Sequence, residues 1–398
     1  MTIETGVLFK NKLTSRAELE ERAGRAASAL ASLGIGTDDR VAILLENDVP
    51  AIELLLAARL LGAVRVLLNC HGTPNEFGYI LNDSGARALI GHTPLLESAL
   101  PGVPDGLPLV RVIPPGANND AASNARVAAA PEWRPWVDSF ARWTIPAPPG
   151  RGNMSYTSGT TGRPKGVLRE PMTPAALERY RFMRELSYFT PDASALIAVP
   201  LYHGGTNMFM EYVIDSGARL VLESRFDAER VLAVIEEQRV THLYLVPTLI
   251  IRLLDLPAKV RSRYDLSSLQ FVCTGGAPCP SEAKRRLIEW LGPVVFEFWG
   301  ATELGLLCTG ATSADALSKP GTVGKAMPGC VVKILDEQGN EVPRGQSGLV
   351  YARALDWPDF TYHNRPEARR EIERNGLITP GDIGYLDEDG YLFLLDRR

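Results

Sequence analysis

The sequence predicts an α/β protein whose sheets are mainly parallel and whose last residues form a small antiparallel β unit. Buried-strand runs alternate with amphipathic helical segments through residues 1–100 and again through 195–299. From about Pro320 the apolar pattern changes to period two, with hairpin turns between the runs. A length of 398 residues is too great for one core, so two or three packed units are expected.

The first hundred residues predict helices that alternate with strands. Ser15 and Glu18 have the spacing of a capping box, and apolar residues at helical spacing follow until Gly34 ends the helix. Pro50 begins a second helix that reaches Leu61. Buried strands are expected at 40–47, 65–69 and 88–92.

Residues 101–150 differ in composition, because ten of the chain's 29 prolines fall there. Proline fixes φ and removes a backbone donor, so we expect a long irregular excursion with one short strand at Leu109–Ile113.

The alternation of strands and helices then returns. Asp227 is expected as an N-cap and Gly292 as a helix stop. Strands are expected at 195–201, 219–223, 241–246, 269–274 and 294–299, and helices at 207–215, 227–238, 248–254 and 281–291. Hairpin turns are expected at 336–341, 343–348 and 387–390.

Composition excludes several classes of protein. The formal net charge of −5, with both signs mixed along the chain, argues against nucleic acid as a partner. No run of 18 apolar residues and no N-terminal secretory signal is present, so we expect a cytoplasmic protein without a membrane span. Five scattered cysteines without a CxxC pair predict reduced thiols rather than a zinc or disulfide framework.

One loop, SYTSGTTGRPKGV at 155–167, predicts phosphate binding. Spaced glycines let backbone N–H groups converge on an anion, hydroxyls add donors, and Lys165 adds one mobile positive charge. The loop is not a Walker A sequence, because Pro164 stands where a glycine is needed and Gly166 replaces the Ser/Thr. No GxSxG elbow occurs, which disfavours an α/β-hydrolase. From composition alone, a flexible surface loop remains an equal alternative.

YTSGTTGRPKG (156–166) resembles the phosphate loop of the adenylate-forming superfamily, which contains acyl-CoA and aryl-CoA synthetases, luciferases and peptide-synthetase adenylation domains. The chain is most similar to an acyl- or aryl-CoA ligase. Further family-like motifs follow in the expected order: Pro200-Leu201-Tyr202-His203, Thr274-Gly275-Gly276-Ala277-Pro278, Trp299-Gly300-Ala301-Thr302-Glu303, Thr379-Pro380-Gly381-Asp382 and Asp396-Arg397. In the third motif Trp299 replaces the family's tyrosine.

The resemblance implies ATP, Mg²⁺ and coenzyme A as cofactors. Lys165 and the loop would hold the β- and γ-phosphates, Thr302 would bond the α-phosphate, and Glu303 would ligate Mg²⁺. The other implied loop residues are Thr157, Ser158, Gly159, Thr160, Thr161 and Gly162.

The resemblance also implies nucleoside and acyl contacts. Trp299 would stack on adenine beside Gly275, Gly276, Ala277, Pro278 and Gly300, and Asp382 with Arg397 would hold the ribose. His203 would sit between nucleotide and acid. The implied acyl-pocket residues are His203, Gly205, Phe209, Gly275, Phe298 and Gly305.

The family's architecture refines the fold to two βα subdomains and a small β subdomain. The expected divisions are 1–165, which includes the excursion at 101–150, then 166–319 and 320–398. Complete family members continue past a hinge into a smaller domain that supplies a catalytic lysine, and we expect this chain to end before it. The 398 residues alone are therefore expected to adenylate slowly and to form thioester inefficiently.

The implied activity is ATP-dependent conversion of a monocarboxylic acid to an acyl-adenylate and then to an acyl-CoA thioester. The expected pocket has no cationic residue for a dicarboxylate and no aspartate for an amino group. An aryl or hydroxycinnamate-like acid is favoured, with a medium-chain fatty acid close behind. The alternatives are a catalytically silent nucleotide- or acyl-binding module and a fatty-acid-specific acyl-AMP ligase. Lys165, Glu303 and Asp382 are all present, which favours an enzyme.

Overall fold

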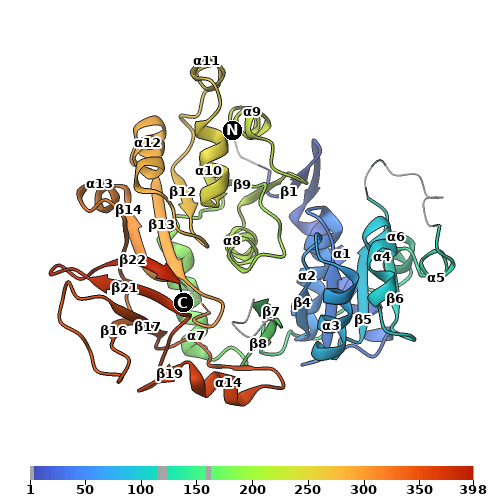
Figure 1. Ribbon diagram of the computed structural model, residues 1–398. Coiled ribbons are helices and arrows are strands. Elements are labelled where there is room, and N and C mark those ends of the chain that lie inside the picture. Colours follow the sequence, from blue (N-terminus) through green and yellow to red (C-terminus); the bar gives the residue numbers. More distant parts are fainter. Residues whose placement is uncertain (1–3, 115, 117–122, 158–162, 306, 398) are drawn as a thin grey trace.

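Two sheets organise the computed structural model, which describes residues 4–114, 116, 123–157, 163–305 and 307–397 (Figure 1). Both are built around parallel strands, and antiparallel strands extend the second toward the C-terminus, so the α/β prediction is confirmed. No helix in the described chain is long and apolar enough to cross a membrane.

The first sheet has seven strands in the order β18-β8-β7-β4-β3-β5-β6. Five strands run parallel, while β8 and β18 are antiparallel to their neighbours. Their bounds are β3 (Arg40–Leu44), β4 (Val64–Leu67), β5 (Ala88–His92), β6 (Leu109–Val112), β7 (Asn153–Thr157), β8 (Lys165–Arg169) and β18 (Phe360–Tyr362).

The second sheet joins 15 of the described strands. Its parallel part follows the order β13-β12-β11-β9-β10-β1, with β2 antiparallel at the edge: β1 (Gly6–Phe9), β2 (Lys12–Ser15), β9 (Ser194–Ile197), β10 (Arg219–Leu222), β11 (His242–Leu245), β12 (Phe271–Thr274) and β13 (Val295–Gly300). Its antiparallel part is β14 (Leu307–Thr312), β15 (Thr322–Ala326), β16 (Cys330–Leu335), β17 (Gly348–Ala354), β19 (Glu373–Arg374), β20 (Leu377–Ile378), β21 (Asp382–Leu386) and β22 (Tyr391–Arg397).

Helices accompany both sheets (Figure 1). The early ones are α1 (Arg16–Ser32), α2 (Val49–Leu61), α3 (Pro74–Ser84), α4 (Thr93–Ala99), α5 (Ala125–Ala128) and α6 (Trp133–Asp138), with a 3₁₀ turn at Leu100–Gly102. The later ones are α7 (Pro174–Leu186), α8 (Gly204–Asp215), α9 (Ala228–Gln238), α10 (Pro247–Leu254), α11 (Ala258–Arg261), α12 (Ser281–Leu291), α13 (Ser313–Ser318) and α14 (Pro366–Glu371).

The helix signals read from sequence identify most of the boundaries. Ser15 accepts from the Glu18 N–H and Asp227 caps α9, while Gly292 with φ +85° ends α12 at the predicted residue. The reciprocal half of the first capping box is wrong, because the Glu18 carboxylate pairs with Arg22 instead. Helices α3 and α7 were not expected, although α3 carries a complete capping box.

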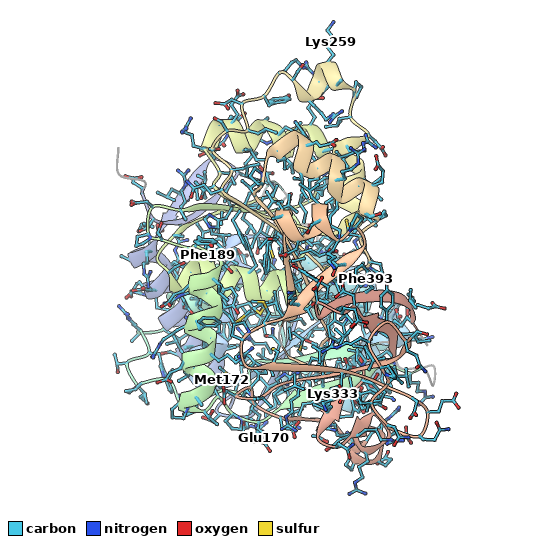
Figure 2. The ribbon with its side chains drawn as sticks, turned by 90° about the vertical axis from the view of Figure 1, so that its left-hand side faces the viewer. Glu170, Met172, Phe189, Lys259, Lys333 and Phe393 are labelled. Atoms are coloured by element: carbon cyan, nitrogen blue, oxygen red, sulfur yellow. The ribbon has the colours of Figure 1, made fainter. Side chains whose placement is uncertain are left out.

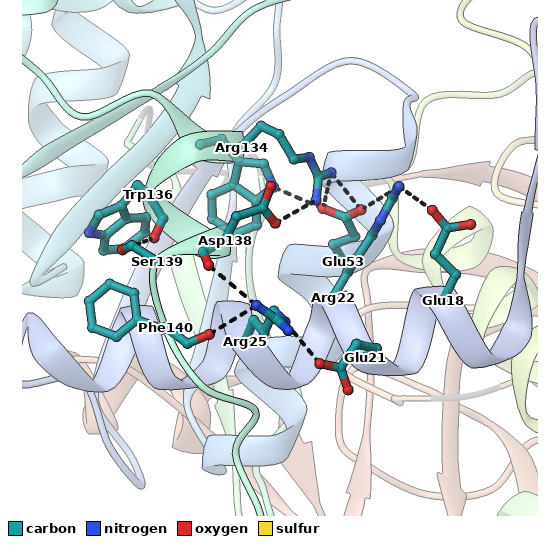
Figure 3. A network of polar contacts seen from close by, with 11 residues as sticks. Glu18, Glu21, Arg22, Arg25, Glu53, Arg134, Trp136, Asp138, Ser139 and Phe140 are labelled. Carbon is teal, nitrogen blue, oxygen red and sulfur yellow. Dashed lines mark hydrogen bonds and ion pairs between the residues drawn. The ribbon is translucent and has the colours of Figure 1, made fainter.

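The prediction that residues 101–150 form an irregular excursion is wrong in part. The segment holds β6, α5 and α6, and Trp133 of α6 is 1% exposed. The Trp133 indole N–H donates to Glu53 at 2.9 Å, and the Arg134 guanidinium pairs with the same carboxylate at 2.7 Å. Figure 3 shows how this buried acid also meets Arg22 of α1, so the segment is bound to the first two helices. Tertiary packing here overrides the proline-rich composition.

The strand pairings cross the expected subdomain divisions. Strand β1 pairs with β10, and β18 pairs with β8, which begins at Lys165. Segments far apart in sequence therefore share one sheet, and the division into 1–165, 166–319 and 320–398 stays a prediction.

Helix α7 follows β8 of the first sheet in the sequence and precedes β9 of the second sheet. In Figure 2 it stands with Met172 near its lower end and Phe189 above it. Met183 and Phe189 are buried, while Leu177 and Phe182 are exposed. Tyr180 of α7 packs on Tyr212 of α8, and Met183 and Leu186 of α7 line the apolar cavity described in the next section.

Candidate active site

A buried carboxylate joins the two sheets. Glu303 follows β13 and is 8% exposed. One of its oxygens, Oε1, accepts from the Thr157 hydroxyl at 3.0 Å and from the Tyr362 hydroxyl at 2.9 Å. Thr157 ends β7 and Tyr362 ends β18, so three segments distant in sequence converge on one oxygen. The other oxygen, Oε2, has no such bond among the described residues.

Lys165 lies beside this carboxylate cluster. It is the first residue of β8 and stands opposite Thr157 in the antiparallel register. Its ammonium is 5.1 Å from the centroid of the Tyr362 ring, and the residue is 9% exposed. Burial and the Glu303 charge raise the pKa of the Tyr362 phenol, which therefore stays a hydrogen-bond donor to that carboxylate.

A second polar contact joins the motif that contains Trp299, in β13, to the motif that contains Asp382, at the start of β21. The Trp299 indole N–H donates to the Asp382 carboxylate at 2.8 Å, and the Arg397 guanidinium is 3.7 Å from its other oxygen. Trp299 is mostly buried and packs with Leu304 and Cys308. The register of β13 against β14 shifts between Trp299 and Gly300, just before Thr302 and Glu303.

Sequence reasoning missed two residues of this site, Tyr362 and Arg169. The Arg169 guanidinium donates to the backbone carbonyls of Thr302, Glu303 and, at 2.9 Å, Pro358. It thereby fixes the backbone that presents the Thr302 and Glu303 side chains. Burial lowers the pKa of Arg169 to about 10, so the group remains charged at neutral pH. Neither residue belongs to a motif noted from the sequence, although Arg169 follows the quoted loop by only a few positions.

For several residues predicted to bind the nucleotide or the acid, the structure gives no contact that bears on the predicted role. Ser158, Gly159, Thr160, Thr161 and Gly162 lie outside the described residues. Gly276 adopts φ +81° in the turn after β12, and it is exposed with Ala277 and Pro278. His203 immediately precedes α8, is exposed, and contacts Tyr202 with ring centroids 4.4 Å apart.

An apolar cavity is enclosed by α7, α8 and the second sheet. Its lining contains no Asp, Glu, Lys or Arg: Met183, Leu186, Ser187, Gly205, Met208, Phe209, Tyr212, Tyr244, Phe271, Cys273, Phe296, Phe298, Leu307 and Met327. Its volume is about 20 Å³, which is room for a single water molecule. The surrounding side chains therefore nearly fill it.

The cavity wall has no room for a larger side chain at two glycines. A methyl group at Gly205 would come within 2.3 Å of the Tyr244 hydroxyl, and one at Gly275 within 2.6 Å of the Phe298 ring. Gly205, Phe209 and Phe298 line the cavity, and Gly275 packs on its wall, so the structure brings four predicted acyl residues together. Gly305 instead faces Arg169 and Trp357, and does not line the cavity.

The acidic residues present suit a metal held partly by a substrate. No group of three His, Cys, Asp or Glu that could hold a metal occurs within the described ranges. Mg²⁺ commonly binds through one or two carboxylates together with substrate phosphates and waters. Glu303 is a single buried carboxylate beside a lysine, which fits that pattern.

The site therefore has two parts, a buried carboxylate that joins the two sheets and an apolar cavity between α7 and α8. The AMP-binding enzyme family matches residues 4–354, and the chain belongs to that family of adenylate-forming enzymes. The chain is 32% identical to a feruloyl-CoA synthase from an Amycolatopsis species, with 99% of this chain and 75% of the relative covered. It is 31% identical to the long-chain-fatty-acid–CoA ligase FadD13 of Mycobacterium tuberculosis, covering 96% and 73%.

Solved structures agree with the fold. The amide bond synthetase McbA from Marinactinospora thermotolerans superposes with a TM-score of 0.84 at 27% identity, covering 99% of this chain and 77% of that one. A benzoate CoA ligase from Burkholderia xenovorans has a TM-score of 0.83 at 24% identity, over 99% and 77%. The chain thus spans about three-quarters of the length of its relatives.

Proposed function

We propose that the protein activates a monocarboxylic acid with ATP to an acyl-adenylate, which the complete enzyme converts to a coenzyme A thioester. The observation that carries the proposal is that the Thr157 and Tyr362 hydroxyls both donate to the buried Glu303 carboxylate, while the Lys165 ammonium lies 5.1 Å from the centroid of the Tyr362 ring. Tyr362 thus contacts both the acid and the phosphate-loop lysine. This arrangement is suited to neutralising a polyphosphate.

Each residue has a part in that chemistry. Lys165 and the Thr157 hydroxyl bind the β- and γ-phosphates, and Thr302 bonds the α-phosphate. Glu303 would hold Mg²⁺, which would supply positive charge to neutralise the phosphates. Asp382 accepts from the ribose hydroxyls, with Arg397 beside it, and Trp299 contacts adenine along the turn at 275–278. The substrate carboxylate attacks the α-phosphorus near His203, so the bond to pyrophosphate breaks as the acyl-phosphate bond forms.

The acid is apolar and carries one carboxylate. No charged side chain lines the cavity, and six of its lining residues are aromatic: Phe209, Tyr212, Tyr244, Phe271, Phe296 and Phe298. Flat rings favour an aryl or hydroxycinnamate-like acid, and three methionines, Met183, Met208 and Met327, give the wall the adaptability that a medium-chain fatty acid needs. Of the two relatives, one is named for an aromatic acid (feruloyl) and the other for a fatty acid (long-chain), and the proposed acids belong to these two kinds.

The family's smaller domain supplies a catalytic lysine and rotates to build the thioester site, and its contribution is needed for full turnover. A cytoplasmic location is consistent with the coenzyme A pool that such a reaction uses.

Acid-dependent exchange of labelled pyrophosphate into ATP tests the proposal. We expect exchange only with ATP, Mg²⁺ and an acid of the right class, and its loss in Lys165→Ala. Lys333→Ala is a matched control, because this lysine pairs with Glu341 at 2.6 Å on the surface of the antiparallel strands. Equal exchange in both variants would contradict the assignment of Lys165.

Two alternatives give different results. A catalytically silent binding module would bind ATP or an acyl-adenylate mimic yet exchange no pyrophosphate with any acid. A fatty-acid-specific acyl-AMP ligase would exchange only with alkyl acids and release acyl-adenylate without forming thioester when coenzyme A is added.

A further inference from the structure

Two cysteines from separate strands meet beside the acyl cavity. Cys308 of β14 is fully buried, and Cys330 at the start of β16 is half-buried. Met327 links them through the backbone, because its N–H donates to the Cys308 carbonyl at 2.9 Å and its carbonyl accepts from the Cys330 N–H at 2.8 Å. The Cys330 thiol donates to the carbonyl of Leu307, the residue before Cys308, at 3.6 Å, which places its sulfur beside the Cys308 backbone.

A buried cation touches one of these thiols. The Arg179 guanidinium donates to the Cys330 sulfur at 3.0 Å and to the Pro328 carbonyl at 2.6 Å, and the residue is 7% exposed. Within the described part of the chain Arg179 has no carboxylate partner, and its Nε atom is buried without a hydrogen bond. An uncompensated buried cation favours an anion beside it, and the Cys330 sulfur is the group in contact that can become one.

The two thiols are therefore unequal. The interaction with Cys308 and the charge of Arg179 lower the pKa of Cys330, although burial acts in the opposite direction. The pKa of Cys308 is raised by the same interaction and by burial. An unequal pair of this kind supplies one thiol that ionises more readily and reacts first, and a second thiol in reserve.

We propose that Cys330 and Cys308 form a reversible redox pair that hydroperoxides oxidise to an intramolecular disulfide. The Cys330 thiolate attacks one peroxide oxygen, the O–O bond breaks, and a sulfenic acid and hydroxide or alkoxide result. The Cys308 sulfur then attacks the sulfenic sulfur and displaces hydroxide, which leaves as water with the Cys308 proton. One peroxide is reduced by two electrons and the two thiols lose them.

The other cysteines provide an internal contrast. Burial raises the pKa of Cys70 to about 12 and that of Cys279 to about 11, and burial also raises the pKa of Cys273. Cys70 donates its S–H to the Leu45 carbonyl at 3.2 Å and has no arginine contact among the described residues. These three thiols should react later than Cys330 with peroxide at neutral pH.

The pair is placed where oxidation would change the acyl cavity. Leu307 precedes Cys308 and Met327 lies between the two cysteines, and both side chains line the cavity. A covalent bond would fix β14 to the start of β16 and restrict how these two residues rearrange for a substrate. This consequence rests on the proposed acid activation, whereas disulfide formation itself does not.

Peptide mapping of the peroxide-treated protein tests the pair directly. After brief treatment with equimolar hydrogen peroxide and blocking of remaining thiols, we expect two of the five thiols to be lost. A linked peptide containing Cys308 and Cys330 should appear, and dithiothreitol should restore both thiols. Cys330→Ser should abolish the link and retain all four remaining thiols, whereas Cys70→Ser should leave the linked peptide unchanged.

Cys308→Ser separates the two chemical steps. In this variant we expect a sulfenic acid on Cys330 that dimedone traps, because the resolving thiol is absent. Thermal melting of each serine variant confirms folding before oxidation. Dimedone labelling of Cys330 in the wild-type protein without any linked peptide would overturn the proposal, as would loss of Cys70 or Cys279 before Cys330.

Discussion

The parts of the site that we propose to hold the nucleotide and the acid, called the nucleotide side and the acyl side, are built differently. Around Glu303 and Asp382, three hydroxyl or indole donors bond to carboxylates at 2.8–3.0 Å, and these donors come from three strands. Behind α8, aromatic and methionine side chains enclose only about 20 Å³. Hydrogen bonds fix direction as well as distance, whereas apolar contacts fix only volume. The nucleotide side is thus preorganised, and the acyl side must rearrange to accept an acid.

The largest effect is expected when the charge at the centre of the nucleotide side is removed. Glu303→Gln keeps an oxygen that accepts from Thr157 and Tyr362, but it weakens metal binding. We expect adenylation to fall by about 10²–10³-fold, as when one electrostatic stabiliser is lost from an active site. The rate of pyrophosphate release measures the rate of adenylation. A fall that higher Mg²⁺ fully reverses would support a metal role, while an unchanged rate at low Mg²⁺ would exclude one.

Lowering the pH should reduce the stability of the folded protein through His242, which packs beside the acyl side. His242 stacks on Phe189, with ring centroids 4.5 Å apart, and burial lowers its pKa to about 4. Between about pH 6.5 and pH 4 the unfolded chain binds a proton that the folded chain does not, so stability falls as pH falls through this window. The loss is roughly 3 kcal/mol.

Denaturant unfolding at pH 7 and pH 4.5 measures this loss. His242→Gln should show a smaller difference between the two pH values than the wild type. His71→Gln, at an exposed position, serves as the matched control and should retain the full difference. If both variants retain it, His242 does not carry the effect.

The ribose contact should give an effect of intermediate size. Asp382→Asn preserves an acceptor for the Trp299 indole but removes the charge that binds two hydroxyls. A hydrogen bond to a charged group contributes roughly 1.5–3 kcal/mol, so KM for ATP should rise by about 10–100-fold. KM for the acid should change little. A rise confined to the acid would place Asp382 on the wrong side of the site.

Filling the acyl side should change which acids react. Gly205→Ala puts a methyl group within 2.3 Å of the Tyr244 hydroxyl, and overpacking of this kind costs about 1–3 kcal/mol. We expect loss of activity toward bulky acids, with KM for ATP retained. Adding Tyr244→Phe removes the clashing oxygen and should restore part of the activity toward bulky acids. No recovery in the double variant would mean that the clash is not the cause.

The smallest effect is expected at Tyr362. Tyr362→Phe removes one of two donors to Glu303 and leaves the ring under Lys165. A net hydrogen bond is worth about 0.5–1.5 kcal/mol, so adenylation should fall by roughly three- to tenfold. A loss as large as that of Glu303→Gln would assign Tyr362 a direct part in the reaction.

The same contrast explains what the sequence could predict. Helix caps such as Asp227 and the carboxylates Glu303 and Asp382 carry local signals, because cap geometry and motif spacing involve few residues. Tyr362 and Arg169 became visible only when β18 paired with β8, a contact across almost 200 residues. Gly305 was expected in the acyl pocket from the family resemblance, yet its neighbours Arg169 and Trp357 come from other strands and loops. Pairing of distant strands, rather than local pattern, placed these groups.

Binding of non-hydrolysable acyl-adenylate mimics is the most direct test of the central claim that one preformed nucleotide site adjoins an adaptable acyl cavity. Thermal unfolding would be followed with benzoyl, cinnamoyl, hexanoyl, lauroyl and aminoacyl mimics, with AMP as the reference. At a hundredfold excess over Kd a ligand stabilises the native state by about 2.7 kcal/mol. We predict stabilisation by AMP, a larger and graded shift that peaks at one apolar acyl type, and its loss in Lys165→Ala. No shift with any mimic, or equal shifts in Lys165→Ala, would contradict the account.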